Sequence, residues 1–188
     1  MSVGSNIDAR MSSLPPPSEL VAKLVERGIQ LPAGKVVVGG YGDSAELSRE
    51  LIELIRKGPK RAGTGLLWEY EFESEPIPEA GSIEIVVDHD NEPVLVTRLT
   101  SVEIVPFNQV SAQYAATEGE GDGSLEYWRS GHWSFFSREC ARIGRVPAED
   151  MPVVCSVFEL LFVVPPSAVQ PFAGAGAQRQ DAQGPVRS

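Results

Sequence analysis

A cluster of positive charge stands out in residues 56–64, whose sequence is RKGPKRAGT. Lys60 lies beside Arg61. A lysine acts as a general base when burial or neighbouring cations lower its pKa. Thr64 carries a hydroxyl that becomes a nucleophile when a base activates it. The alternative is a solvated helix end whose cations complement the helix dipole, and spacing alone favours that alternative.

A second candidate is the acidic, glycine-rich segment 118–123, EGEGDG. Glu118, Glu120 and Asp122 alternate with glycines, so an extended loop could point all three carboxylates to one side and hold a divalent cation. One of these acids could instead be a general acid. The alternative is a solvated loop in which Asp122 or Ser124 caps the following helix. Composition favours neither interpretation.

A third candidate combines Trp128, Arg129 and His132. Trp128 and His132 are four residues apart and share one helix face, so an indole could stack on a base while Arg129 contacts phosphate. Aromatic residues at helical spacing are more often core residues, and the periodicity here favours that interpretation. A similar alternation at Trp68, Tyr70 and Phe72 indicates core or strand positions.

Composition excludes several classes of protein. Sixteen Lys and Arg against 26 Asp and Glu give a net charge of −10, which argues against extended DNA or RNA binding. No apolar run approaches the roughly 20 residues that span a bilayer, and residues 1–10 lack the apolar segment of a secretory signal. Cys140 and Cys155 form no disulfide framework or zinc motif. We therefore expect a cytoplasmic protein without a resident cofactor, apart from the cation considered above.

The apolar pattern predicts one folded domain, residues 18–164, between disordered tails at 1–17 and 165–188. Helices are expected from Ser18 to Arg27, from Asp43 to the break at 58–59, around 107–114, and from Ser124 onward. A hairpin is expected from strands 82–87 and 94–105, and 153–164 reads as a strand buried on both faces. This order indicates an α+β fold, a small curved sheet or barrel with helices packed at its ends.

Several segments together resemble the ASCH domain family. They are GDSAEL at 42–47, GPKRA at 58–62, PEAG at 78–81, VEIVPFNQV at 102–110, and EGEGDGSLEYW at 118–128 followed by His132 and Phe136. The resemblance covers about residues 39–164 and is to the longer bacterial members that carry the last segment. It implies a PUA-like small β-barrel with flanking helices, and domains of that type commonly handle RNA.

The resemblance also implies site residues and activities. ASCH-like domains are associated with RNA cleavage and with hydrolysis of N4-acetylcytidine, in which a Lys-x-x-Thr motif supplies base and nucleophile and a later Glu donates a proton. Here Lys60 and Glu118 match, whereas the third residue after Lys60 is Gly63 and the hydroxyl follows at Thr64. The expected substrate-binding residues are Tyr41, Arg61, Trp128, Arg129 and His132.

Three functions remain open at this point. The first is a Lys/Glu pocket that binds RNA or a modified nucleoside and cuts RNA as a ribonuclease. The second is an amidohydrolase acting on N4-acetylcytidine or a related small amide, with Lys60, Thr64 and Glu118 as the catalytic set. The third is a module that recognises RNA or a protein partner without catalysis.

Overall fold

A computed structural model of the chain describes residues 14–166. The tails predicted to be disordered, 1–17 and 165–188, lie for the most part outside the described residues. Among the helices of the described range, none combines the length and the apolar character that crossing a bilayer requires.

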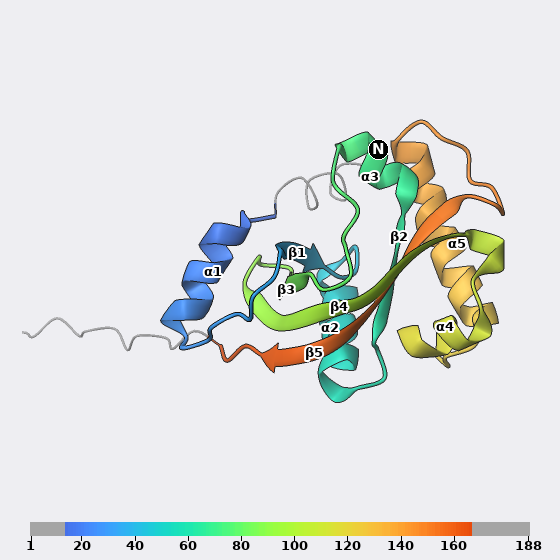
Figure 1. Ribbon diagram of the computed structural model, residues 1–188. Helices are drawn as coiled ribbons and strands as arrows, with labels where there is room; N and C mark the ends of the chain where they lie inside the picture. Colours follow the sequence, from blue (N-terminus) through green and yellow to red (C-terminus); the bar gives the residue numbers. More distant parts are fainter. Residues whose placement is uncertain (1–13, 167–188) are drawn as a thin grey trace, which may run out of the picture.

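The centre of the fold is a five-stranded mixed sheet with the order β1-β3-β4-β5-β2. Its strands are β1 (Val36–Gly40), β2 (Ala62–Leu66), β3 (Ile83–Val87), β4 (Pro93–Pro106) and β5 (Pro152–Val163). Among these five strands of the described range, only the β1–β3 pair is parallel. The long strands β4 and β5 pair along most of their length and curl, with register shifts in both β3–β4 and β4–β5 (Figure 1). Such irregularities increase the local twist and bend a sheet toward a half-barrel.

The helices lie at the ends and on the faces of this sheet. They are α1 (Pro17–Glu26), α2 (Ala45–Lys57), α3 (Leu67–Glu73), a 3₁₀ turn at Phe107–Gln109, α4 (Ala112–Glu118) and α5 (Leu125–Arg142). Figure 1 shows α1 at one end of the sheet and α4 with α5 at the other. The α+β class, the curved sheet and the hairpin formed by β3 and β4 confirm the sequence-based expectations.

Three local expectations were wrong. The cap of α2 is Ser44, whose hydroxyl accepts a hydrogen bond from the Leu47 amide at 3.2 Å, whereas Asp43 binds Arg138. Trp68, Tyr70 and Phe72 lie on the short helix α3 and not on a strand, and of their expected core positions Trp68 does pack against the core whereas Phe72 is 57% exposed. The strand β5 is buried on both faces only near its start, since Phe162 close to its end is 39% exposed.

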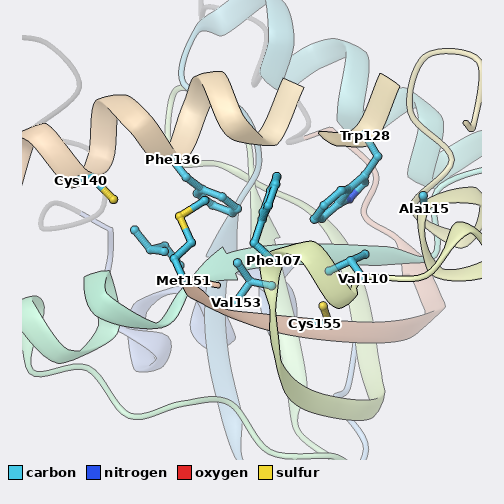
Figure 2. Close-up of a cluster of buried hydrophobic side chains, with 10 residues drawn as sticks. Phe107, Val110, Ala115, Trp128, Phe136, Cys140, Met151, Val153 and Cys155 are labelled. Carbon is cyan, nitrogen blue, oxygen red and sulfur yellow. The ribbon is translucent and has the colours of Figure 1, made fainter. Parts of the chain in front are cut away.

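An aromatic core joins α5 to the sheet (Figure 2). Trp128 and Phe136, which are spaced by two helical turns on α5, pack on Phe107, and Met151 and Val153 complete the cluster from the start of β5. Trp128 is 3% exposed, so the interpretation of this residue as core is confirmed. This packing holds α4 and the start of α5 against β2, where the polar network described below is found.

A separate charged cluster holds α3 against α5. Arg142 binds three carboxylates, those of Glu69 at 3.0 Å, Glu73 at 2.7 Å and Glu139 at 2.7 Å. Three acids share one guanidinium, so the cluster carries excess negative charge. Burial and the neighbouring Glu139 carboxylate raise the pKa of Glu69 to about 7, although Arg142 opposes this shift.

We expect this cluster to weaken the fold as the pH rises. The folded protein keeps a proton on Glu69 up to about pH 7, whereas an unfolded chain releases it near the ordinary value of 4.5. The stabilisation that comes from the raised pKa of Glu69 is thus complete below its ordinary pKa of 4.5 and is lost as the pH rises through about 7. Urea denaturation gives the free energy of unfolding at pH 5 and at pH 8. The difference between these two free energies should be smaller in Glu69→Gln than in the wild type by on the order of 1 kcal/mol. If the free energy of unfolding changed equally between pH 5 and pH 8 in the wild type and in Glu69→Gln, the result would contradict a raised pKa at Glu69.

Candidate functional site

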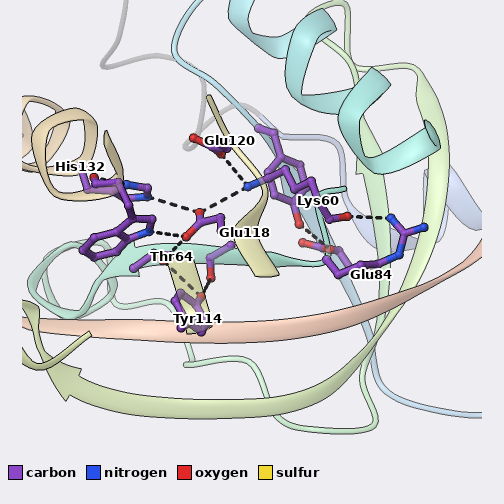
Figure 3. A network of polar contacts seen from close by, with 11 residues as sticks. Lys60, Thr64, Glu84, Tyr114, Glu118, Glu120 and His132 are labelled. Carbon is purple, nitrogen blue, oxygen red and sulfur yellow. Dashed lines mark hydrogen bonds and ion pairs between the residues drawn. The ribbon is translucent and has the colours of Figure 1, made fainter. Parts of the chain in front are cut away.

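The carboxylate of Glu118 is the centre of a buried polar network (Figure 3). One oxygen, Oε1, lies 3.3 Å from the Lys60 ammonium and 3.3 Å from Nε2 of His132. The other, Oε2, accepts hydrogen bonds from the Thr64 hydroxyl at 2.9 Å and from the Trp128 indole N–H at 2.6 Å. The Glu118 and Lys60 side chains are 2% and 1% exposed, so these charges interact with little screening from water.

The backbone of β2 brings Lys60 and Thr64 to the same carboxylate. Lys60 stands just before β2, and Thr64 is the third residue of that strand. Alternate residues of an extended chain point to the same side, so an even spacing of four directs both side chains toward Glu118. The Thr64 hydroxyl therefore reaches the network without any bend at Gly63, which stands where the family motif has its threonine.

The end of α4 is fixed against the segment that carries Lys60. The Arg61 amide donates to the Thr117 carbonyl at 2.9 Å, which ties the last turn of α4 to the start of β2. Gly119 then ends α4 in a left-handed conformation with φ of 66°. A Cβ at Gly119 would collide with the Pro59 carbonyl, so glycine permits both the turn and the close approach of the two segments. Glu118 is the last residue of α4, and this junction sets the direction of its side chain.

Opposing effects act on the Glu118 carboxyl. Burial alone would raise its pKa, but the charge of Lys60 and the hydrogen bonds from His132 and Trp128 hold the pKa of Glu118 well below its ordinary value. Glu118 is therefore an ionised carboxylate at neutral pH. Lys60 also binds Glu120 at 2.6 Å, and the Glu120 side chain is 25% exposed. Glu120 thus covers Lys60 on the side that faces solvent.

Tyr114 extends the network on the side of Thr64. Its hydroxyl donates to the Gly63 carbonyl at 2.8 Å and lies 3.2 Å from the Thr64 hydroxyl. Burial and the charge of Glu118 raise the pKa of Tyr114 far above its ordinary value, so the phenol stays neutral. The sequence did not indicate this role, because Tyr114 was recognised only as part of the apolar periodicity of a helix.

Tyr41 and Arg61, two of the expected substrate-binding residues, have different surroundings. The Tyr41 ring lies beside Lys60, with Nζ 5.5 Å from the ring centroid, and its hydroxyl donates to Glu84 at 3.3 Å. Arg61 instead donates to the carbonyls of Ile55 at 2.8 Å and Lys60 at 2.7 Å. Arg61 therefore caps the end of α2, where a cation complements the helix dipole.

The three substrate-binding residues that were expected on α5 also differ in their surroundings. Trp128 stacks on His132 at 4.3 Å between ring centroids, and both reach Glu118. The buried Trp128 ring therefore orients Glu118 and leaves little surface for a base to stack on. Arg129 is exposed and donates to the Asn108 carbonyl at 3.0 Å, which places it outside the network.

The structure does not support the expected cation site at Glu118, Glu120 and Asp122. The first two bind Lys60, and Asp122 accepts a hydrogen bond from the Ser124 amide at 2.8 Å. Within residues 14–166, no group of three or more His, Cys, Asp or Glu side chains is arranged to hold a metal ion. The loop caps α5 instead, since the Ser124 hydroxyl accepts from the Tyr127 amide at 3.1 Å.

The chain is an α+β domain with a polar site in its interior. It consists of a curled mixed sheet with helices at its ends, and a buried Lys–Glu–Thr network lies beside one edge strand. The chain belongs to the ASCH domain family, whose model matches residues 38–162. ASCH domains have a PUA-like fold, a fold often linked to RNA binding. No curated protein matches the chain.

Solved structures that are similar to this one include the following two. The ASCH domain from Lactobacillus crispatus JV V101 is 30% identical, with 79% of this chain and 96% of that chain covered and a TM-score of 0.68. A protein from Enterococcus faecalis V583 is 29% identical, with 85% and 90% covered and a TM-score of 0.64. These similarities extend over most of the described residues and support a common fold.

Proposed function

We propose that this ASCH domain binds a modified nucleoside and hydrolyses a small amide on its base, with N4-acetylcytidine as the model substrate. One observation carries the proposal: the Thr64 hydroxyl and the Lys60 ammonium meet on the two oxygens of the buried Glu118 carboxylate. A hydroxyl that donates to a carboxylate is the arrangement of a nucleophile with its base.

In this mechanism the Thr64 oxygen attacks the amide carbonyl carbon while Glu118 accepts the hydroxyl proton. Glu118 then returns the proton to the nitrogen as the C–N bond breaks, and the amine leaves. Water attacks the acyl group on Thr64, again losing a proton to Glu118. The carboxylic acid then leaves, and the proton returns to the Thr64 oxygen. This assignment makes Glu118 both acceptor and donor of the proton, whereas the family resemblance implies that the lysine accepts the proton and the glutamate only donates one.

Lys60 supports both partners of this reaction. An ammonium has three N–H donors, and Glu118 and Glu120 account for two of them. The third can stabilise negative charge on the carbonyl oxygen during attack. Movement of Lys60 toward that oxygen removes the strongest attraction that keeps Glu118 ionised. The carboxylate then becomes a better base at the moment when Thr64 must lose its proton.

The local charge favours a neutral amide over a phosphodiester. Lys60 faces two carboxylates, Glu118 and Glu120, and Glu84 lies behind Tyr41. Arg61, the nearest further cation in sequence, donates to backbone carbonyls. The network is therefore net negative, and it repels a phosphate group at short range. The same argument weighs against the ribonuclease alternative.

The test exposes the full-length protein to N4-acetylcytidine and, separately, to an end-labelled single-stranded RNA. We expect chromatography to show cytidine and acetate from the nucleoside, and intact RNA. RNA cleavage that disappears in Lys60→Ala would instead support a ribonuclease. Nucleoside binding without turnover, retained in Glu118→Gln, would support a recognition module.

A further inference from the structure

Lys60 is a buried cation whose donors are not all used. Its side chain is 1% exposed, and its ammonium binds Glu118 at 3.3 Å and Glu120 at 2.6 Å. Figure 3 shows the ammonium joined to both of these carboxylates. An ammonium has three N–H donors, so one donor of Lys60 has no acceptor within residues 14–166. The Lys60 ammonium can therefore bind a further oxygen when space for one opens beside it.

The two carboxylates on Lys60 differ in how firmly they are held. Glu118 is 2% exposed and has three further polar partners, which are Thr64, Trp128 and His132. Glu120 is 25% exposed, and within the described part of the chain its carboxylate binds Lys60 alone. Displacing Glu120 thus breaks one contact, whereas displacing Glu118 breaks four. Glu120 is the partner of Lys60 that a ligand can replace.

The loop that carries Glu120 keeps its backbone in place when the side chain moves. The Gly123 amide donates to the Glu120 carbonyl at 2.9 Å, which closes a turn. A Cβ at Gly121 would collide with the Tyr127 ring, so this ring packs directly on the backbone of the turn. A glutamate side chain has several rotamers, and a partly exposed one can swing into water. Rotation of the Glu120 side chain therefore uncovers Lys60 without unfolding the loop.

Uncovering Lys60 favours a ligand that carries an oxygen acceptor. An ammonium that stays buried and loses its acceptor is costly, and an oxygen bound in the vacated place offsets that cost. Once Glu120 has moved, both the unused donor of Lys60 and the donor that Glu120 vacates can reach this oxygen. Lys60 and Glu118 then balance in charge, so the place accepts a neutral carbonyl or one small carboxylate.

We propose that the place of the Glu120 carboxylate on Lys60 is an acyl-oxygen subsite. It takes the carbonyl oxygen of an amide and, after hydrolysis, the carboxylate of the acid that is released. That the oxygen belongs to an acyl group rests on the proposed function, in which Thr64 attacks a carbonyl carbon. Acetate carries the same carboxylate as a glutamate side chain and is the acid that N4-acetylcytidine would release, so it is the simplest probe of the subsite.

Reactivity of the Lys60 amine measures whether Glu120 covers it. The full-length protein is treated with the N-hydroxysuccinimide ester of propionic acid, without any nucleoside, and mass spectrometry follows each lysine. Lys57, which is 74% exposed, serves as the reference within the same protein. We expect Glu120→Ala to speed labelling of Lys60 relative to Lys57 roughly tenfold, the factor that one charged hydrogen bond accounts for. Glu126→Ala, which removes an exposed acid on α5, should leave the ratio unchanged.

Acetate then tests whether the vacated place binds a carboxylate. In Glu120→Ala, sodium acetate should slow the labelling of Lys60 several-fold, because acetate occupies the position that the glutamate left. Sodium chloride at the same ionic strength should not slow it, which separates binding from screening. The wild-type protein should respond less to acetate, since Glu120 competes for the same donor.

The results distinguish the subsite from the proposed function. If Glu120→Ala does not speed the labelling of Lys60, or if acetate does not slow it, the subsite is overturned. If both effects occur and N4-acetylcytidine is not hydrolysed, the proposed function fails and a carboxylate site at Lys60 remains. Should thermal melting show that Glu120→Ala does not fold, Glu120→Gln removes the charge and keeps the volume. Labelling of Lys60 should then rise several-fold, and an unchanged rate would refute the role of Glu120.

Discussion

Replacing Glu118 with alanine is expected to lower the free energy of unfolding by roughly 3–5 kcal/mol, the cost typical of breaking a buried ion pair. The substitution removes the acceptor of Lys60, Thr64, Trp128 and His132 together. Lys60 would retain only Glu120, while its own side chain is 1% exposed. Urea denaturation at pH 7, followed by tryptophan fluorescence, measures the change.

Two variants separate the causes of this loss. Glu118→Gln keeps the volume and an acceptor oxygen but removes the charge, so it should cost less than alanine. The double variant Lys60→Met/Glu118→Leu removes both charges and should recover much of the stability, because buried ion pairs contribute little against apolar residues of similar volume. Glu50→Ala, at an exposed position on α2, should change stability by less than about 0.5 kcal/mol. A Glu118→Ala protein as stable as Glu50→Ala would contradict the argument.

Most of the long elements could be predicted from the sequence, whereas the edge strands could not. The β3–β4 hairpin and α5 carry strong local patterns, which explains why both were found. β1 and β2 are five residues each, VVVGG and AGTGL, with two glycines apiece. Glycine weakens strand propensity, so these segments become strands only through pairing with β3 and β5. That pairing is between residues distant in sequence, and local patterns do not contain it.

The same distinction applies to the site. Lys60 and Glu118 match the family motif and Thr64 lies one position after its threonine, so the sequence indicated all three, but their contact depends on the unpredicted strand β2. Arg61 and Arg129 were expected to bind substrate by residue type, and the structure shows both donating to backbone carbonyls. Glu84 carried no signal beyond being the polar residue of an apolar strand. Its proximity to Tyr41 arises from the pairing of β1 with β3, which local patterns do not contain.

Replacing Thr64 with valine is expected to lower amide hydrolysis by at least about a thousandfold with little change in the fold. Valine has nearly the shape of threonine, so the substitution removes the nucleophilic hydroxyl and its 2.9 Å hydrogen bond to Glu118 while preserving the strand. The lost hydrogen bond should cost about 1 kcal/mol of stability, because Lys60, His132 and Trp128 still hold Glu118. Initial rates with N4-acetylcytidine and urea denaturation measure the two effects separately.

Thr64→Ser is the matched control, because it keeps the hydroxyl and deletes only a methyl group. The serine protein should retain hydrolysis within about tenfold of the wild type, since the nucleophile and its proton acceptor both remain. A valine protein that hydrolyses the nucleoside at the wild-type rate would exclude a covalent intermediate on Thr64. Hydrolysis would then require direct attack by water, with Glu118 as its base and Lys60 at the carbonyl oxygen, and the hydroxyl of Thr64 would serve only to orient the carboxylate.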